Sequence, residues 1–177
     1  MKKIGVIVVV FCSLGVFVSC DPNEANKENT KSAPHIEKIS EDKNLDSLTN
    51  NLMYVPAYSQ VYSMNSTKEE ALVNLSVTLS IRNTDINNTI IIRSIKYYKN
   101  NGELVKDFIE YPMELAPMAS ENYFISASDK TGGIGANFIV EWSSEEKITN
   151  PFIEALMLGG LGNYGYSWSS IGYPLNY

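Results

Sequence analysis

Carboxylates and aromatic rings, rather than thiols or imidazoles, are the side chains that could carry chemistry in this sequence. The only histidine, His35, and both cysteines, Cys12 and Cys20, lie before residue 52. Ser-His-Asp and Cys-His nucleophiles are therefore excluded for the region from residue 52 onward, and so are zinc sites built from Cys and His.

Asp129 and Glu141 are the candidate catalytic pair, because two carboxylates can act as acid and base in glycoside hydrolysis. Glu141 alternates with Val140 and Trp142 in a strand-like run, which predicts a solvated position for its side chain. We expect a protein without catalysis, with a carboxylate-dependent hydrolase of an envelope glycan as the alternative. We also expect no metal and no cofactor: calcium at Asp85 or Asp129 is conceivable, but no D-x-D-x-D-G pattern supports it.

Three glycines, Gly132, Gly133 and Gly135, precede a strand-like run over residues 136–142. A phosphate-binding loop needs a helix after its glycines, because the helix N-terminus holds the phosphate. The order here instead predicts a tight turn or bulge with positive φ angles. A nest of backbone amides that binds a small anion or ligand is the alternative.

Aromatic residues are the other candidates for binding. Tyr58 and Tyr62 share one face of a strand-like run, and Tyr164, Tyr166 and Trp168 lie among glycines near the C-terminus. Planar rings on a rigid sheet can stack on sugars or anchor a protein partner. The competing and favoured interpretation is that they fill the core and pad the sheet edges.

The N-terminus has the layout of a secretory signal over residues 1–19, with two lysines before an apolar run too short to span a membrane. The letters FVSC that end at Cys20 resemble the lipobox of bacterial lipoprotein signals, in which the cysteine is lipidated. This predicts an extracytoplasmic protein of a bacterial cell envelope, held on the membrane by the lipid on Cys20. Ordinary cleavage, or an uncleaved anchor with Cys20 as a spectator, is the alternative.

Composition divides the rest of the chain in two. Residues 20–51 comprise the lipidated cysteine and a polar stretch that predicts a flexible tether, in which His35 is a spectator. Residues 52–177 hold both tryptophans and all eleven tyrosines, and are enough for a single domain. The domain has no basic stripe, so we expect no nucleic-acid partner.

Apolar residues in this domain recur with period two. Leu75, Val77, Leu79 and Ile81 alternate with polar residues, which predicts a strand with one buried face. Further strand-like runs follow, one of them ending at an Asn101-Gly102 hairpin signal. Several short strands at this spacing predict an antiparallel β-sandwich, immunoglobulin-like in broad outline, with a small β-barrel as the alternative.

Four motifs in order, YVPAYSQVY, LSVTLSIRNTD, ELAPMAS and GGIGANFIVEW, resemble the bacterial family named domain of unknown function 3124. The resemblance covers residues 52–171 and implies an extracytoplasmic domain, often borne on lipoproteins, with no assigned activity. We therefore expect a membrane-tethered, non-catalytic module that binds an envelope glycan or protein, or takes part in envelope assembly. A structural spacer without a specific ligand is a further alternative.

Overall fold

The computed structural model describes residues 35–39, 44–63, 68 and 71–176, which belong to one compact unit of the chain. No helix among these residues has the length and hydropathy of a membrane span. One sheet contains β1 (Ile36–Lys38), β2 (Asn51–Pro56), β5 (Ile90–Tyr98), β6 (Leu104–Asp107), β7 (Met113–Leu115), β9 (Asn137–Ser143) and β12 (Tyr173–Leu175). The other contains β3 (Gln60–Tyr62), β4 (Leu72–Arg82), β8 (Ser120–Ile125), β10 (Phe152–Leu161) and β11 (Tyr164–Ile171).

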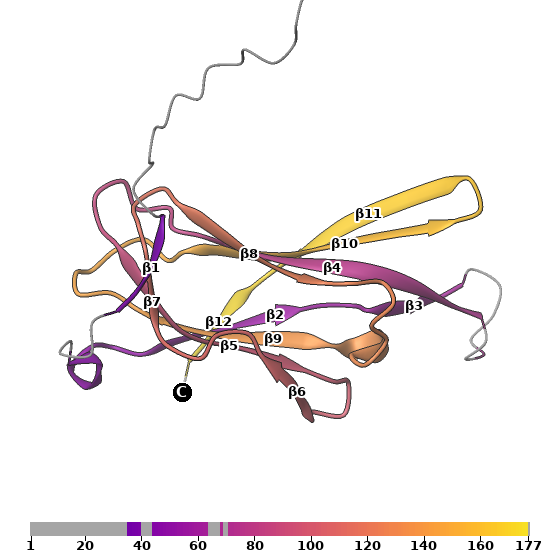
Figure 1. Cartoon of the computed structure of the whole chain (residues 1–177), viewed down its shortest axis with the longest axis horizontal. Coiled ribbons are helices and arrows are strands. Elements are labelled where there is room, and N and C mark those ends of the chain that lie inside the picture. Colours follow the sequence, from indigo (N-terminus) through magenta and orange to yellow (C-terminus); the bar gives the residue numbers. More distant parts are fainter. Residues whose placement is uncertain (1–34, 40–43, 64–67, 69–70, 177) are drawn as a thin grey trace, which may run out of the picture. The chain divides into compact units, whose positions relative to one another are not determined.

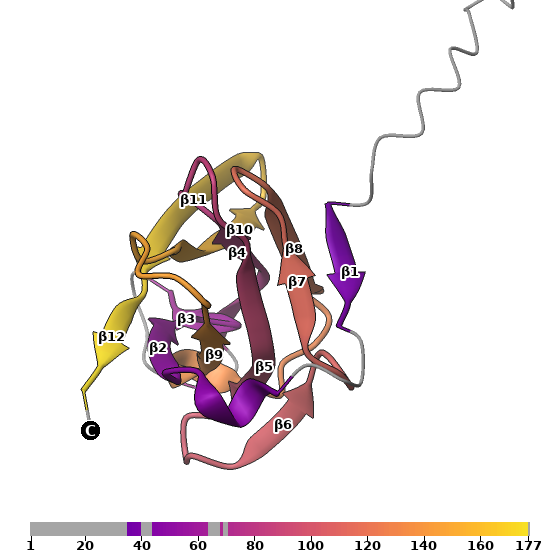
Figure 2. The same ribbon diagram turned by 90° about the vertical axis from the view of Figure 1, so that its left-hand side faces the viewer.

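The two sheets lie face to face (Figures 1 and 2). The first has the order β1-β7-β5-β9-β2-β12, with β6 beside the second half of β5. The second has the order β11-β10-β4-β3, and β8 shares one side of β4 with β3. All pairings are antiparallel, and the sheets do not close on each other. The expected antiparallel β-sandwich is therefore confirmed, and the alternative of a barrel is wrong.

The core is built by the period-two pattern that the sequence shows. Leu75, Val77, Leu79 and Ile81 of β4 are all 0% exposed, as the alternation predicts. They meet the inward side chains of the facing sheet, which include Val55, Ile95, Phe138 and Val140. Burying one such side chain contributes roughly 1.5–3 kcal/mol relative to leaving it exposed, so this layer dominates the favourable free energy of folding.

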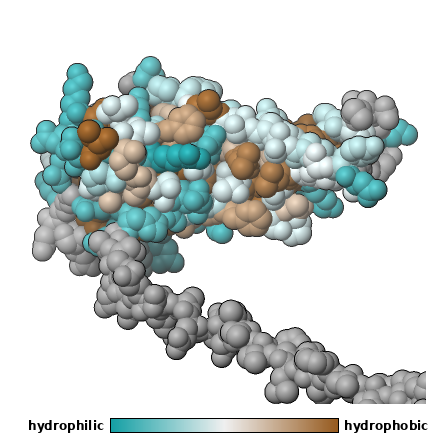
Figure 3. All heavy atoms as spheres, turned by 90° about the horizontal axis from the view of Figure 1, so that it is seen from above, coloured by the Kyte–Doolittle hydropathy of each residue, from teal (hydrophilic) through white to brown (hydrophobic). Residues whose placement is uncertain are grey.

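The outer face of the second sheet is partly apolar. Figure 3 looks down on this face and shows hydrophobic patches in its middle, between hydrophilic and neutral areas. The large apolar side chains exposed on it are Phe124, Phe152, Leu156, Leu158 and Ile171.

Two turns follow the sequence signals closely. β5 and β6 form the hairpin expected at Asn101-Gly102, where Gly102 has a φ of +83° that glycine adopts without steric cost. After β4, the Asp85 carboxylate accepts hydrogen bonds from the backbone N–H groups of Asn87 and Asn88, at 2.9 and 2.8 Å. These bonds lower the pKa of Asp85 below its ordinary value, because they favour the charged form.

Asn83 holds the same turn from inside the protein. It is 2% exposed, and its side-chain amide donates to the carbonyl oxygens of Asn88, Leu115 and Ala116 at 2.8–3.1 Å. Its Oδ1 accepts from the backbone N–H of Asp85 at 3.0 Å. One buried side chain thus connects the end of β4 to the end of β7.

Part of the range that the sequence assigns to a tether lies on the sheet. β1 extends the first sheet by pairing with β7, and Ile36 packs against the core. Leu45, in the short 3₁₀ turn η1 (Leu45–Ser47), accepts a hydrogen bond from Arg93 at 3.0 Å. β1 could not be predicted from the sequence, because three residues are too few to show a period-two pattern and the stretch around them is polar. His35, expected to be a spectator, lies 3.0 Å from a carboxylate oxygen of Glu121.

We expect Asn83→Ala to lower the free energy of unfolding by about 2–4 kcal/mol, because several buried backbone groups lose their partner at once. Denaturant unfolding followed by circular dichroism measures this change. Asn87→Ala in the same turn is the matched control: its side chain is exposed and makes no hydrogen bond in the described structure, so the change should stay within about 0.5 kcal/mol. Equal effects of the two variants would contradict the role given to Asn83.

Candidate functional site

The glycine cluster forms a 3₁₀ turn, η3 (Gly133–Gly135), just before β9. The residue before it, Gly132, allows the turn to lie against the buried ring of Tyr97. A Cβ atom at Gly132 would lie 1.8 Å from Oη of Tyr97 and 2.7 Å from Cβ of Ala136. Burial raises the pKa of Tyr97, so its hydroxyl is protonated at neutral pH. Glycine at position 132 is therefore explained by close packing.

The backbone of the same turn is engaged by neighbouring residues. Gly133 has a φ of +71°, which strongly favours glycine. Its N–H donates to the carbonyl of Lys130 at 3.2 Å, and its own carbonyl accepts from the backbone N–H and the hydroxyl of Ser59, both at 3.1 Å. An amide nest would leave such N–H groups pointing into a concavity. No described contact of the turn points to an anion.

The candidate aromatic residues do not form one surface. The rings of Tyr166 and Trp168 stack with their centroids 6.0 Å apart, and both pack partly buried against the core. Tyr58 also packs against the core. Tyr164 is 81% exposed on β11, and Tyr62 is 50% exposed on β3. The stacked pair thus matches the core-filling interpretation, while the side chains of Tyr62 and Tyr164 are largely exposed to solvent.

The two candidate carboxylates have separate partners. Asp129 accepts hydrogen bonds from the backbone N–H and the hydroxyl of Thr131, at 3.0 and 2.6 Å. Glu141 accepts from the side-chain amide of Asn50 at 2.6 Å and from the hydroxyl of Ser94 at 2.9 Å. The two carboxylates share no partner in the described structure, and their pairing as acid and base stays a prediction.

A metal site and the lipidation site are the two remaining candidate sites. Within the described residues, no group of three or more His, Cys, Asp or Glu side chains is placed to hold a metal ion. Cys20, the predicted lipidation site, lies outside the described residues.

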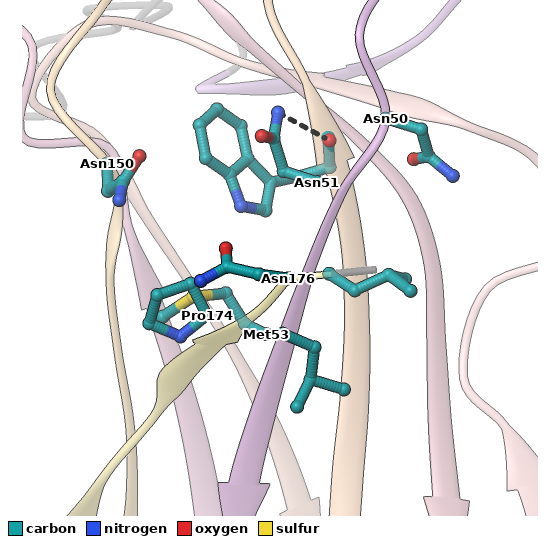
Figure 4. Close-up of a pocket in the computed structure, with 9 residues that line it drawn as sticks. Asn50, Asn51, Met53, Asn150, Pro174 and Asn176 are labelled. Carbon is teal, nitrogen blue, oxygen red and sulfur yellow. Dashed lines mark hydrogen bonds between the residues drawn. The ribbon is translucent and has the colours of Figure 1, made fainter.

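The structure brings together a polar hollow that the sequence did not indicate. Where β2, β9 and β12 meet, asparagine side chains surround a pocket of about 260 Å³ (Figure 4). The strand register creates it, because Asn51 lies opposite Trp142 across β2 and β9. Figure 4 shows Asn50 and Asn150 on opposite sides, with Asn51 and Asn176 between them. We call this the asparagine pocket.

The asparagine pocket is neutral. Besides its four asparagines, its lining consists of Trp142 and four apolar residues, none of which carries an acid or base. Charged side chains lie outside this lining, and Glu145, Glu146 and Lys147 border an adjoining hollow that shares Trp142. Glu141 holds the amide of Asn50, and Arg93 lies 3.8 Å from Glu141 on the other side. This pair of charges positions the rim of the pocket without entering it.

Trp142 forms part of the wall with a buried polar group. It is 4% exposed, and its indole N–H has no hydrogen-bond partner in the described structure. A buried donor without a partner costs about 1–3 kcal/mol, so such groups in native proteins call for an explanation. A second hollow also has Asn51, Trp142 and Asn150 in its lining.

No local pattern could have revealed this site. Its asparagines come from three separate parts of the chain, residues 50–51, 150 and 176, and are joined by the pairing of β2 with β9 and β12 and by the loop between β9 and β10. The adjacent pair Asn50-Asn51 was the one available signal. It falls at the expected boundary between tether and domain, where asparagine is also an ordinary turn residue.

A family model described as "Protein of unknown function (DUF3124)" matches residues 50–175. The chain belongs to this family. The resemblance seen in the four motifs is thereby confirmed, and the match extends beyond residue 171 to Leu175. The DUF3124 region contains β2 through β12 and every lining residue of the asparagine pocket except Asn176. β1 precedes the DUF3124 region.

Comparison with other proteins adds little to the family assignment. A solved structure titled "Crystal Structure of Thermotoga maritima 1070" shares 15% identity with the DUF3124 protein, covers 70% of this chain and 92% of its own, and has a TM-score of 0.38. A likeness at that level transfers no property. No curated protein matches the chain.

Gly132→Ala should destabilise this DUF3124 protein by about 1–3 kcal/mol, because the new methyl group overlaps the Tyr97 hydroxyl and forces the turn to move. Thermal and denaturant unfolding measure the loss. Combining it with Tyr97→Phe, which removes the overlapping oxygen, should recover part of that loss.

Gly165→Ala provides the control, because a Cβ atom there would meet nothing nearer than 3.9 Å. Its effect should stay within about 0.5 kcal/mol. If Gly132→Ala were equally silent, close packing would not be the reason for Gly132.

Proposed function

We propose that this DUF3124 protein is a lipid-tethered, extracytoplasmic module of a bacterial envelope that binds a neutral, hydroxyl-rich ligand, such as a glycan, without catalysis. The observation that carries the proposal is the asparagine pocket, a hollow lined by amides and lacking any ionisable side chain.

Amide side chains suit hydroxyl groups because each kind of group both donates and accepts hydrogen bonds. An asparagine offers two N–H donors and a carbonyl acceptor, and a hydroxyl offers one donor and two lone pairs. The side chains of Asn150 and Asn176 make no hydrogen bond in the described structure, and both residues are exposed. Their amides are therefore available to a ligand.

The size of the pocket favours a small unit of a larger ligand. Pockets for drug-sized molecules usually measure about 300–1,000 Å³, and this one is slightly smaller, at about 260 Å³. A ligand oxygen or a bridging water near Trp142 would also give the indole N–H the partner that it lacks.

The same lining argues against catalysis at this place. General acid–base chemistry needs a titratable group within hydrogen-bond reach of the reacting atom. Glu141, which lies outside the lining, is occupied by Asn50 and Ser94. Its role is to position the rim.

The binding proposal is tested with the full chain in detergent, titrated with neutral oligosaccharides and with peptidoglycan fragments. Trp168→Phe leaves Trp142 as the only tryptophan, so its emission reports on the pocket. We expect a change in emission and a rise in melting temperature of several degrees, since a ligand at a hundred times its Kd adds about 2.7 kcal/mol. Asn150→Ala and Asn176→Ala should each raise Kd about five- to tenfold.

Asn122→Ala is the control, because this exposed asparagine lies on the outer edge strand β8, outside the pocket lining. It should leave Kd unchanged. Absence of binding by every saccharide, or binding that is insensitive to both pocket variants, would overturn the proposal.

The lipid anchor is supported by the sequence FVSC after a charged and apolar signal. We expect metabolic incorporation of labelled palmitate in a bacterial host and recovery of the protein with membranes. Cys20→Ser should abolish the label and release the protein, while Cys12→Ser should change neither, because residue 12 leaves with the signal. Label retained in Cys20→Ser would rule out this anchor.

A further inference from the structure

β11 is a long edge strand with nothing paired to one of its sides. It pairs with β10 over Tyr164–Ile171, and no described strand lies on its other side. Figure 1 shows the tip of the β10–β11 hairpin diverging from β4 and β3. At the end of β11 away from the hairpin tip, the hydroxyl of Ser170 donates to the carbonyl of Pro56, which fixes β11 to the first sheet.

The direction of the backbone groups along β11 follows from one hydrogen bond. The N–H of Gly172 donates to the carbonyl of Ile153 at 2.8 Å, so these two residues form a hydrogen-bonded pair. In an antiparallel ladder such pairs alternate with pairs that do not bond. The odd-numbered residues Gly165, Ser167 and Ser169 therefore direct their N–H and C=O groups away from β10, toward solvent.

This edge lacks the features that normally prevent strand pairing. Natural edges are protected by short length, charged side chains or proline. The other edge strands have them: β1, β3 and β12 are three residues long, β6 contains Lys106 and Asp107, and β8 contains Glu121. β11 has eight residues, and the sequence from Ala155 to Tyr177 contains no charged side chain.

We propose that β11 pairs with β11 of a second copy of this chain, antiparallel and about a two-fold axis through Ser167. Ser167 then lies opposite Ser167 of the other copy, and Gly165 lies opposite Ser169. Each of these pairs exchanges two hydrogen bonds between N–H and C=O groups that are otherwise unpaired. The two five-stranded sheets become one continuous sheet.

The same register places aromatic rings together. Tyr166 of one copy lies opposite Trp168 of the other in a pair without backbone bonds, where side chains approach most closely. Tyr166 and Trp168 already stack within each copy, so the row of rings continues across the axis.

A second copy fits this edge better than an unrelated partner, for two reasons. The row of donors and acceptors is complementary to itself when turned about the axis, as an isologous interface requires. The chain carries a net charge of −6, but none of its acidic residues lies on β11, so two copies meet without opposing like charges. The pocket is formed by β2, β9 and β12, so this pairing does not depend on the proposed ligand.

The first test compares the full chain with two variants by sedimentation velocity in detergent. The unchanged protein should be a dimer that dissociates on dilution. Ser167→Pro removes an N–H that points to the free edge, where proline is compatible with a strand, and should give a monomer. Ser167→Ala keeps the N–H and should remain a dimer. A monomeric wild-type protein, or a dimer that survives Ser167→Pro, would overturn the proposal.

The second test reads the register and does not rely on a proline variant that folds. In the full chain with Cys12 and Cys20 replaced by alanine, Ser167→Cys should form a disulfide-linked dimer under mild oxidation, because paired Cα atoms lie about 5.5 Å apart. Ser169→Cys is the matched control: in this register its two copies are roughly 13 Å apart along the strand, beyond the reach of a disulfide. Crosslinking by Ser169→Cys alone, or by neither variant, would contradict the pairing.

Discussion

One strand, β4, organises the half of the sandwich that contains the long hairpin. It pairs with β10 along one side and with both β3 and β8 along the other. Its alternation leaves Leu75, Val77, Leu79 and Ile81 without contact with water. A register slip of one residue would expose all four at once, so the apolar pattern of this strand also fixes the register of its three neighbours. The turn after β4, which Asn83 holds, then directs the chain into the opposite sheet.

Period two, turn chemistry and the family motifs were enough to predict the fold, because each depends on residues close together in the sequence. The Asn101-Gly102 hairpin and the β4 core face are examples. β1 was missed because three residues cannot show a period, and its stability depends on β7, far along the chain. The asparagine pocket was missed for a related reason: Asn51 and Asn150 are brought to one hollow only by the pairing of β2 with β9 and by the loop that follows β9. The glycine cluster was correctly expected to be a turn, but its closeness to Tyr97 could not be inferred from sequence.

Two of the described carboxylates, Asp85 and Glu141, hold backbone and loops in place. Asp85 binds the N–H groups of a turn, and Glu141 joins Asn50 to Ser94. The asparagine pocket, in contrast, contains only amides, an indole and apolar side chains. An environment of this kind distinguishes ligands by shape and hydrogen-bond pattern, and its affinity should vary little with pH or salt.

The position of β1 has a mechanical consequence for the lipid anchor proposed at Cys20. Any pull on that attachment reaches β1 before the core, and β1 is held by three residue pairs at the edge of its sheet. Peeling it away would leave the pairings of the other strands in place, and the chain beyond it would still be held where Arg93 donates to the carbonyl of Leu45. The segment between β1 and β2 ends at Asn50, whose side-chain amide donates to Glu141 on the pocket rim. In the proposed lipid-anchored form, tension would therefore reach the chain next to the pocket only after β1 had separated from β7.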